Sequence, residues 1–254
     1  TDTTVFEVTS VGYKNNLVFT YKEAENKFEL NTTAKTLYTE GQTKVSLKLT
    51  TNLTDKITWK SSNTKVATVN SAGVVTAKAK GTAVITASCG KYTATCTITV
   101  KNPSLTLNKK STTLYKGTRT TLKAYVKGVD ASKVTFTSNN TKVVVVNKTT
   151  GRIVAKAAGK AVITVKCGSL KTTCTVTVKN PTLKLAKTSA SIKVGKKTTI
   201  KATAAPSGTI KYTSSNKKIV TVSSKGVVTG KKKGTAKITV TCNGVSKTFK
   251  VTVK

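Results

Sequence analysis

Residues 63–86 read NTKVATVNSAGVVTAKAKGTAVIT, and this stretch decides the fold because the chain contains it three times. It returns as NTKVVVVNKTTGRIVAKAAGKAVIT at residues 140–164 and as NKKIVTVSSKGVVTGKKKGTAKIT at residues 216–239. Three copies of one apolar, lysine-studded sequence indicate a tandem array of small modules rather than one large domain. Any specificity should therefore lie in the array itself or in the places where its copies differ.

The flanking residues keep the same register in every copy. Trp59, Phe136 and Tyr212 each stand four residues before an asparagine, and the copies are spaced by 75 to 78 residues. Inside a copy apolar and polar residues alternate, as in TAVITASC at residues 82–89, which is the period of a strand with one buried face. We predict about seven short strands per copy, the spacing of a β-sandwich. Hairpin turns are expected at Gly90-Lys91, Gly168-Ser169 and Asn243-Gly244.

The whole motif resembles a known domain. It reads aromatic-x-Ser/Thr-Ser/Asn-Asn-x-x-Val/Ile-x-x-Val, then Gly-x-Val/Ile-x-Ala/Gly, then Gly-x-Ala-x-Ile-Thr, and it resembles the bacterial immunoglobulin-like group 2 (BIG2) domain. The resemblance runs from about Glu29 to Lys254 and implies an all-β chain of three tandem Ig-like β-sandwiches in an elongated array. Such domains occur in surface adhesins and stalks, beside catalytic domains of secreted enzymes, and on phage virions, so the resemblance is specific for fold and not for function.

We predict repeats at 29–101, 102–179 and 180–254, with Asn102-Pro103 and Asn180-Pro181 at the joins. Residues 1–28 need a separate account, because FEVTSVGYKNNLVFTYK at residues 6–22 resembles the closing hairpin ITASCGKYTATCTITVK at residues 85–101. It is interpreted as the remnant of an upstream domain, as a hairpin that docks on the first repeat, or as one that joins a neighbouring subunit by strand complementation. The last interpretation would allow homo-assembly.

Charge is the strongest compositional signal. Lys and Arg total 45 against 8 Asp and Glu, giving a formal net charge of +37, and every acidic residue lies at or before Asp130. Such a surface attracts polyanions, among them cell-wall polymers, acidic glycans, anionic lipid headgroups and nucleic acid. The alternative is that lysine keeps sheet edges soluble and unpaired. Nucleic acid is disfavoured because the basic runs lack interleaved aromatic residues.

Lysine density rises toward the C-terminus. The third copy has KKK before its second glycine, where the earlier copies have AKAK and AKAA. We take as candidate polyanion contacts Lys196, Lys197, Lys217, Lys218, Lys231, Lys232 and Lys233.

Other chemistry finds little support in the sequence. The chain has no His, and residues 131–254 have no carboxylate, so general acid–base catalysis at neutral pH lacks its usual groups and we predict a protein that is not an enzyme. We expect no metal site and no cofactor, with Asp55 and Asp130 acting as turn formers. The three aromatic residues of the motif are expected in the core.

The five cysteines are predicted to be free and buried. A turn at Gly90-Lys91 places Cys89 opposite Tyr92 and Cys96 opposite Ile85, which offsets the two sulfurs too far for a disulfide. In the third copy Phe249 takes the place of the second cysteine, which is the behaviour of an apolar filler.

These observations favour a non-enzymatic cell-surface stalk or adhesion module of an exported bacterial protein, in contact with wall polymers, acidic glycans or another surface protein. The chain starts at Thr1 without Met, which we interpret as a mature product or an excised piece. The sequence contains no run of about 18 apolar residues, which is the length needed to span a bilayer. An extracellular or cell-surface location is expected. The alternatives are a phage virion decoration, a self-assembling fibre subunit, and accessory modules of a secreted enzyme.

Overall fold

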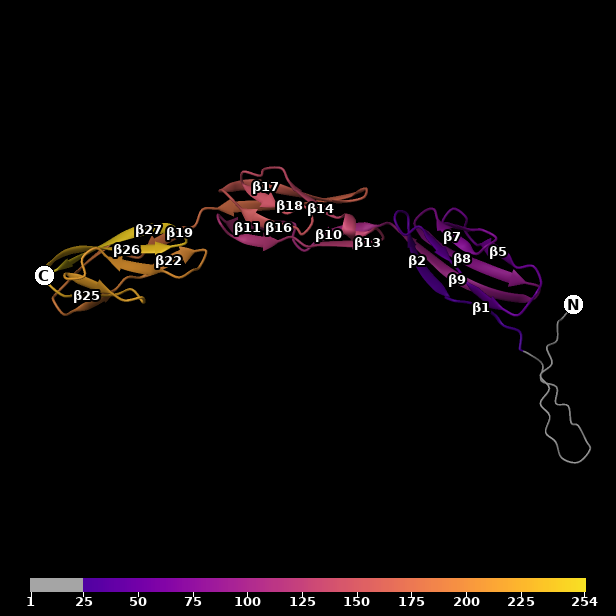
Figure 1. Ribbon diagram of the computed structural model, residues 1–254, viewed down its shortest axis with the longest axis horizontal. Coiled ribbons are helices and arrows are strands. Elements are labelled where there is room, and N and C mark those ends of the chain that lie inside the picture. Colours follow the sequence, from indigo (N-terminus) through magenta and orange to yellow (C-terminus); the bar gives the residue numbers. More distant parts are fainter. Residues whose placement is uncertain (1–24) are drawn as a thin grey trace, which may run out of the picture. The chain divides into compact units, whose positions relative to one another are not determined.

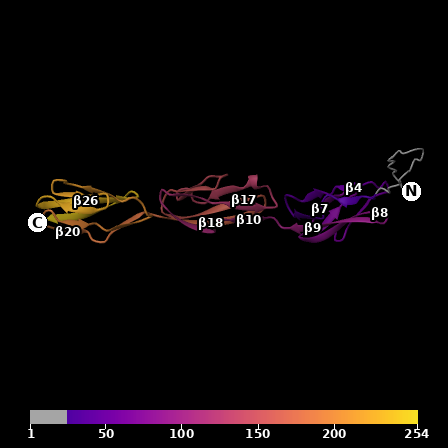
Figure 2. The ribbon, with the colours of Figure 1, turned by 90° about the horizontal axis from the view of Figure 1, so that it is seen from below.

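The computed structural model describes residues 25–254, and these form an all-β chain of three repeated sandwiches (Figure 1). The predicted fold class is therefore confirmed. Figure 2, which turns the view by 90°, shows the same grouping of strands by repeat. The hairpin predicted at residues 6–22 lies outside the described residues.

The strands of the first repeat are β1 (Phe28–Leu30), β2 (Ala34–Tyr38), β3 (Lys44–Ser46), β4 (Leu49–Thr51), β5 (Thr58–Ser61), β6 (Ala67–Val69), β7 (Val74–Ala77), β8 (Gly81–Cys89) and β9 (Tyr92–Lys101). Those of the second are β10 (Ser104–Leu107), β11 (Ser111–Tyr115), β12 (Arg119–Thr121), β13 (Ala124–Lys127), β14 (Thr135–Ser138), β15 (Val144–Val146), β16 (Arg152–Ala155), β17 (Gly159–Cys167) and β18 (Leu170–Lys179), with a 3-10 turn η1 (Ala131–Lys133). Those of the third are β19 (Thr182–Leu185), β20 (Ser189–Ile192), β21 (Lys197–Thr199), β22 (Ala202–Ala205), β23 (Lys211–Ser214), β24 (Val220–Val222), β25 (Val227–Gly230), β26 (Gly234–Cys242) and β27 (Val245–Val253).

One topology is built three times. Each repeat has a four-stranded sheet, in the orders β2-β9-β8-β5, β11-β18-β17-β14 and β20-β27-β26-β23. A three-stranded sheet forms the second layer, in the orders β3-β7-β6, β12-β16-β15 and β21-β25-β24. A short pair completes each repeat: β1-β4, β10-β13 and β19-β22. The last strand of every repeat pairs in parallel with an early strand of the same repeat, as β9 does with β2.

The predicted number of strands was too low, since each repeat has nine where the alternation indicated about seven. Strands such as β3 and β4 have three residues each, which is too few for an alternation of period two to stand out.

The long hairpins follow the predicted register. Cys89 lies opposite Tyr92 and Cys96 lies opposite Ile85, with Gly90-Lys91 as the two-residue turn. The third repeat closes its hairpin in the same way, with Cys242 opposite Val245. All five cysteines are free and buried, as predicted. The cores of the first and third repeats are the inward faces of these strands, in which Ile85 and Ile238 are fully buried.

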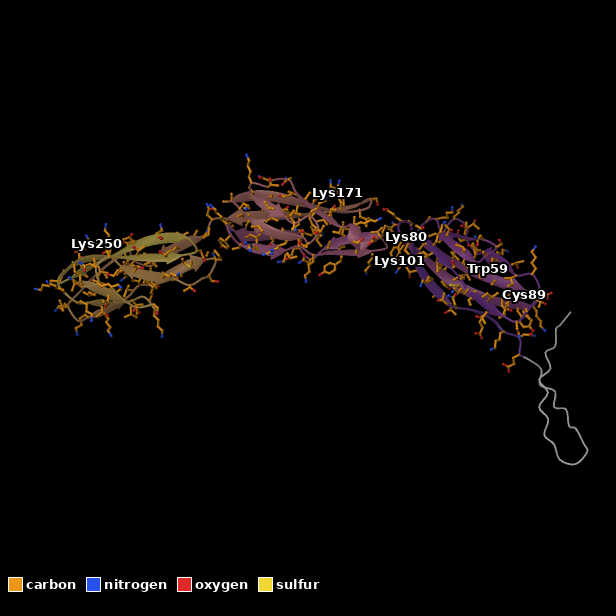
Figure 3. The ribbon with its side chains drawn as sticks, in the orientation of Figure 1. Trp59, Lys80, Cys89, Lys101, Lys171 and Lys250 are labelled. Carbon is orange, nitrogen blue, oxygen red and sulfur yellow. The ribbon has the colours of Figure 1, made fainter. Side chains whose placement is uncertain are left out.

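The three aromatic residues of the motif pack against the core, as predicted. Phe136 is buried, while Trp59 and Tyr212 are half-buried beside their core clusters; Figure 3 shows Trp59 in place. Each of them covers a turn glycine with positive φ. Gly226 has a φ of +77°, and a Cβ atom built on it would lie 2.8 Å from Tyr212 Cζ. Glycine is needed there both for the backbone conformation and for the close approach of the ring.

By contact density the described chain divides into two compact units. The first holds residues 25–106 with 124–134 and 166–171, and the second holds 107–123, 135–165 and 172–254. The second repeat therefore contributes segments to both. In the described residues no helix is long and apolar enough to cross a membrane.

Candidate functional site

The seven lysines singled out in the sequence lie on three connections of the third repeat, and all seven are exposed. Lys196 and Lys197 lie at the start of β21, Lys217 and Lys218 lie between β23 and β24, and Lys231 to Lys233 form the whole link between β25 and β26. We call these seven residues the lysine cluster.

Sheet pairing brings the three connections to one edge. β25 is the central strand of its sheet, and its last residue, Gly230, lies opposite Val220, the first residue of β24. On its other side Thr229 lies opposite Lys197, the first residue of β21. Both neighbours are antiparallel to β25, so the end of β25 meets the beginnings of β21 and β24. The lysines that precede or follow these points must then share one end of the sandwich.

Backbone hydrogen bonds hold the connections against each other. The Lys231 and Lys232 N–H groups both donate to the Ile219 carbonyl, at N···O distances of 2.8 and 3.3 Å. The Gly230 N–H donates to the Lys196 carbonyl at 3.1 Å. Gly234 permits this packing, because its φ is +144° and a Cβ on it would lie 2.9 Å from Ile219 Cδ1. The lysine cluster thus stands on a fixed backbone although its side chains are exposed.

Two further lysines at this end were missed in the sequence. The Val194 N–H donates to the Lys254 carbonyl at 3.2 Å, and the Lys196 N–H donates to the Lys193 carbonyl at 3.1 Å. The parallel pairing of β20 with β27 brings Lys193 and Lys254 here, since Ile192 lies opposite Val253. No local sequence signal marks them, because strands far apart in the chain create the proximity.

The same three connections carry less charge in the other copies. In the first repeat four of the seven matched positions are basic: Lys44, Lys65, Lys78 and Lys80. In the second three are basic: Arg119, Lys142 and Lys156. The backbone pattern is unchanged, because Lys78 and Lys156 donate to the Val66 and Val143 carbonyls, both at 2.8 Å. The third repeat therefore differs from the others in charge and not in conformation.

No carboxylate follows Asp130 in the sequence, so no acidic side chain of the third repeat can neutralise the lysine cluster. An exposed lysine gains little from one anion in water, but several lysines on one surface sum to a field that a multivalent anion can use. Lys171 on β18 and Lys250 on β27 are exposed lysines that do not belong to this cluster (Figure 3).

The two carboxylates with shifted pKa values belong to the first unit. The pKa of Glu40 is lowered by hydrogen bonds from the Ser169 hydroxyl and from the Ser169 N–H, the latter at 3.3 Å. The pKa of Asp130 is lowered by Ser132, whose N–H donates to Asp130 Oδ1 at 2.9 Å, and further by the charge of Lys133. Asp130 caps the 3-10 turn η1, which fits the turn-forming role predicted for it.

Within residues 25–254 no group of three or more His, Cys, Asp and Glu side chains is placed to hold a metal ion. Burial raises the pKa of the Cys96, Cys167 and Cys174 thiols, which keeps them protonated and unreactive.

The chain is similar in structure to the S-layer protein rSbsC(31-844). The alignment covers 93% of this chain and 41% of the S-layer chain, with 20% sequence identity and a TM-score of 0.37. It is also similar to the I9-I11 tandem from titin, with an alignment that covers 89% of this chain and 97% of the titin chain at 13% sequence identity and a TM-score of 0.42. Ice-binding protein 1 of Shewanella frigidimarina (strain NCIMB 400) is 30% identical over 141 residues, which are 52% of this chain. The chain spans only 16% of that relative's length.

The family is established by the repeats themselves. Residues 102–178 and 178–253 each match the bacterial Ig-like domain (group 2), and residues 55–102 match a bacterial Ig-like domain. The chain therefore belongs to the bacterial Ig-like domain (group 2) family, which confirms the resemblance seen in the motif. This membership supports a surface-associated structural module, and it lends no support to the virion alternative.

Proposed function

We propose that the chain is a non-enzymatic stalk and adhesion module on the outside of a bacterial cell, and that its lysine cluster contacts a polyanionic polymer of the wall or of a host. The observation that carries this proposal is the convergence of seven lysines from three connections on one end of the third repeat. The matched ends of the other two repeats carry four and three basic residues on the same backbone.

Binding would work by multivalent charge rather than by one pocket. Each lysine that meets an anionic group releases bound counterions, so affinity falls steeply as salt rises. A polymer with repeated phosphate or carboxylate groups can meet several lysines at once, which an isolated anion cannot do.

The test compares two variants of the full chain that lose the same charge. One replaces Lys231, Lys232 and Lys233 by Gln, and the control replaces Lys171, Lys211 and Lys250, which lie outside the lysine cluster. Binding to a glycerol phosphate polymer and to a sulfated glycan is measured by calorimetry from low salt up to about 0.15 M. We expect only the first variant to lose affinity, and its log K to fall less steeply with log salt, by roughly one for each lysine that no longer meets an anionic group.

Equal losses of affinity in the two variants would mean that charge acts diffusely over the surface. No binding to either polymer would reduce the chain to a spacer. Two alternatives concern architecture: a fibre subunit predicts concentration-dependent self-association in sedimentation velocity, and an accessory segment of a secreted enzyme predicts a catalytic domain in the same gene product.

A further inference from the structure

The second repeat contains a hollow of about 570 Å³. Most of the residues that line it differ from those at the matched positions of the other two repeats. It lies on the outer face of the sheet β12-β16-β15 and is lined by Arg119, Arg152, Lys148, Val145, Val154 and other residues of the same strands and turn. These residues all lie within the second unit.

The register places the two arginines diagonally across neighbouring strands. Arg119 lies opposite Val154, and Arg152, two residues before Val154, lies opposite Thr121. Side chains two residues apart on a strand share a face, so both guanidinium groups rise from the outer face. Diagonal positions are about 7 to 8 Å apart at the backbone, which long side chains span easily. The two are the only arginines in the chain, whose other basic residues are all lysine.

Beside the two arginines the outer face of the sheet carries two valines. Val145 lies opposite Val154 in the neighbouring strand pair, and Val145 is 38% exposed. The inward faces of these strands hold the buried Val144 and Ile153, so the outward valines are not needed for the core. They form an apolar surface on which a ligand can lie.

The other two repeats have a different row at this place. The row Arg119, Val154, Val145 corresponds to Lys44, Thr76, Thr68 in the first repeat and to Lys197, Thr229, Thr221 in the third.

Arg152 stands where the other repeats have a valine, Val74 or Val227. One repeat out of three has thus exchanged a polar Lys-Thr-Thr row for Arg-Val-Val and added a second arginine. The fold itself works without these exchanges, since the other two repeats lack them.

The turn beside the hollow is ordered by its own hydrogen bonds. The Asn147 N–H donates to the Arg152 carbonyl at 2.8 Å, and Asn147 Oδ1 accepts from the Thr150 N–H at 2.8 Å. The Lys148 carbonyl accepts from the Phe136 N–H at 2.9 Å, which fixes the backbone of a third basic residue at the rim. The single carboxylate of residues 102–179 is Asp130, which caps η1, so no acid in this repeat competes for the arginines.

We propose that this hollow is an anion-binding site for a small organic oxyanion, a phosphate or carboxylate carried on an apolar body. Guanidinium groups bind both oxyanions through paired N–H donors, which lysine cannot do. The apolar body lies over Val145 and Val154. The site is separate from the lysine cluster of the third repeat and does not depend on the function proposed for it.

The test uses NMR titration of the full chain, because two arginines give two Nε–H signals that can be followed individually. The probes are butyl phosphate and butyrate, with inorganic phosphate as the matched anion that has no apolar body. We expect saturable shifts of both arginine signals with butyl phosphate, butyrate or both, and binding at least several-fold weaker for inorganic phosphate. Which of the two butyl compounds binds identifies the oxyanion.

Arg152→Val, which installs the residue of the other two repeats, should weaken binding about tenfold or more. Val145→Thr with Val154→Thr should remove the preference for the butyl compounds while the arginine signals still respond to phosphate. The amides of Lys231 to Lys233 are the internal control and should shift only in proportion to ionic strength. The proposal is overturned if the arginine shifts do not saturate, if Arg152→Val binds as tightly as the unaltered chain, or if those lysine amides shift with the same affinity.

Discussion

Gly226, in the turn between β24 and β25, allows a direct test of how the repeated sequence specifies its sandwich. Gly226 and Gly244 both have a φ of +77°, but a Cβ on Gly244 meets nothing within 4 Å, while one on Gly226 lies 2.8 Å from Tyr212 Cζ and 3.1 Å from the Ile200 carbonyl oxygen. Alanine in this left-handed conformation costs about 1 to 2 kcal/mol at either site. Forcing the tyrosine ring aside adds about 1 to 3 kcal/mol at Gly226 alone.

Gly226→Ala should therefore destabilise the third repeat by about 2 to 5 kcal/mol and Gly244→Ala by about 1 to 2 kcal/mol. Native-state hydrogen exchange of the full chain reads each repeat separately, and every 1.4 kcal/mol lowers the protection of the third repeat about tenfold. In a Tyr212→Ala background the clash with the ring is absent and only the 3.1 Å approach to the Ile200 carbonyl oxygen remains, so the extra cost of Gly226→Ala over Gly244→Ala should become much smaller. Equal effects of the two alanine variants in the unaltered background would refute the packing argument.

Three further outcomes are expected. Ile238→Ala should cost about 2 to 5 kcal/mol in the third repeat because Ile238 is fully buried, whereas Thr239→Ala on the exposed face should cost little, both by hydrogen exchange. Cys96 should resist iodoacetamide at neutral pH until the chain is denatured, and mass spectrometry that finds it labelled in the folded protein would contradict its burial. The pKa of Asp130 is lowered in the folded state, so its contribution to η1 is present above the ordinary pKa of a carboxyl and is lost as pH falls through the lowered value. Protection of the η1 amides, taken relative to their intrinsic exchange rate at each pH, should fall on acidification, and Asp130→Asn should remove that dependence.

Much of the fold could be predicted because the signals for the long strands and their turns lie in short, continuous stretches of sequence. Alternation gave the long hairpins, and two-residue turns gave their register, down to the pairing of Cys96 with Ile85. The short strands could not be predicted in this way. A strand of three residues such as β12 shows no periodicity, and it exists because β16 offers it a partner.

The candidate sites depend on that missing information. The KKK run before Gly234 was visible in the sequence, but its approach to Lys196 requires the pairing of β21 with β25. The hollow of the second repeat is still harder to predict from the sequence, because Arg119 and Arg152 are far apart in the chain and become neighbours only when β12 pairs with β16. Comparing the copies could have drawn attention to both arginines, because they interrupt positions that the other repeats fill with lysine and valine.

The parallel pairing in each repeat has a mechanical consequence. In the first repeat Ala34 lies opposite Thr97 and Tyr38 opposite Lys101, so the strand near the entry of the chain runs beside the strand by which the chain leaves. The pairs β11-β18 and β20-β27 repeat this arrangement. Tension along the chain would slide such strands past each other in shear and load their hydrogen bonds together, whereas an antiparallel hairpin pulled from its open end gives way one bond at a time. Under such tension the parallel pair of each sandwich would bear the load at the points where the chain enters and leaves that sandwich, one pair after another along the chain.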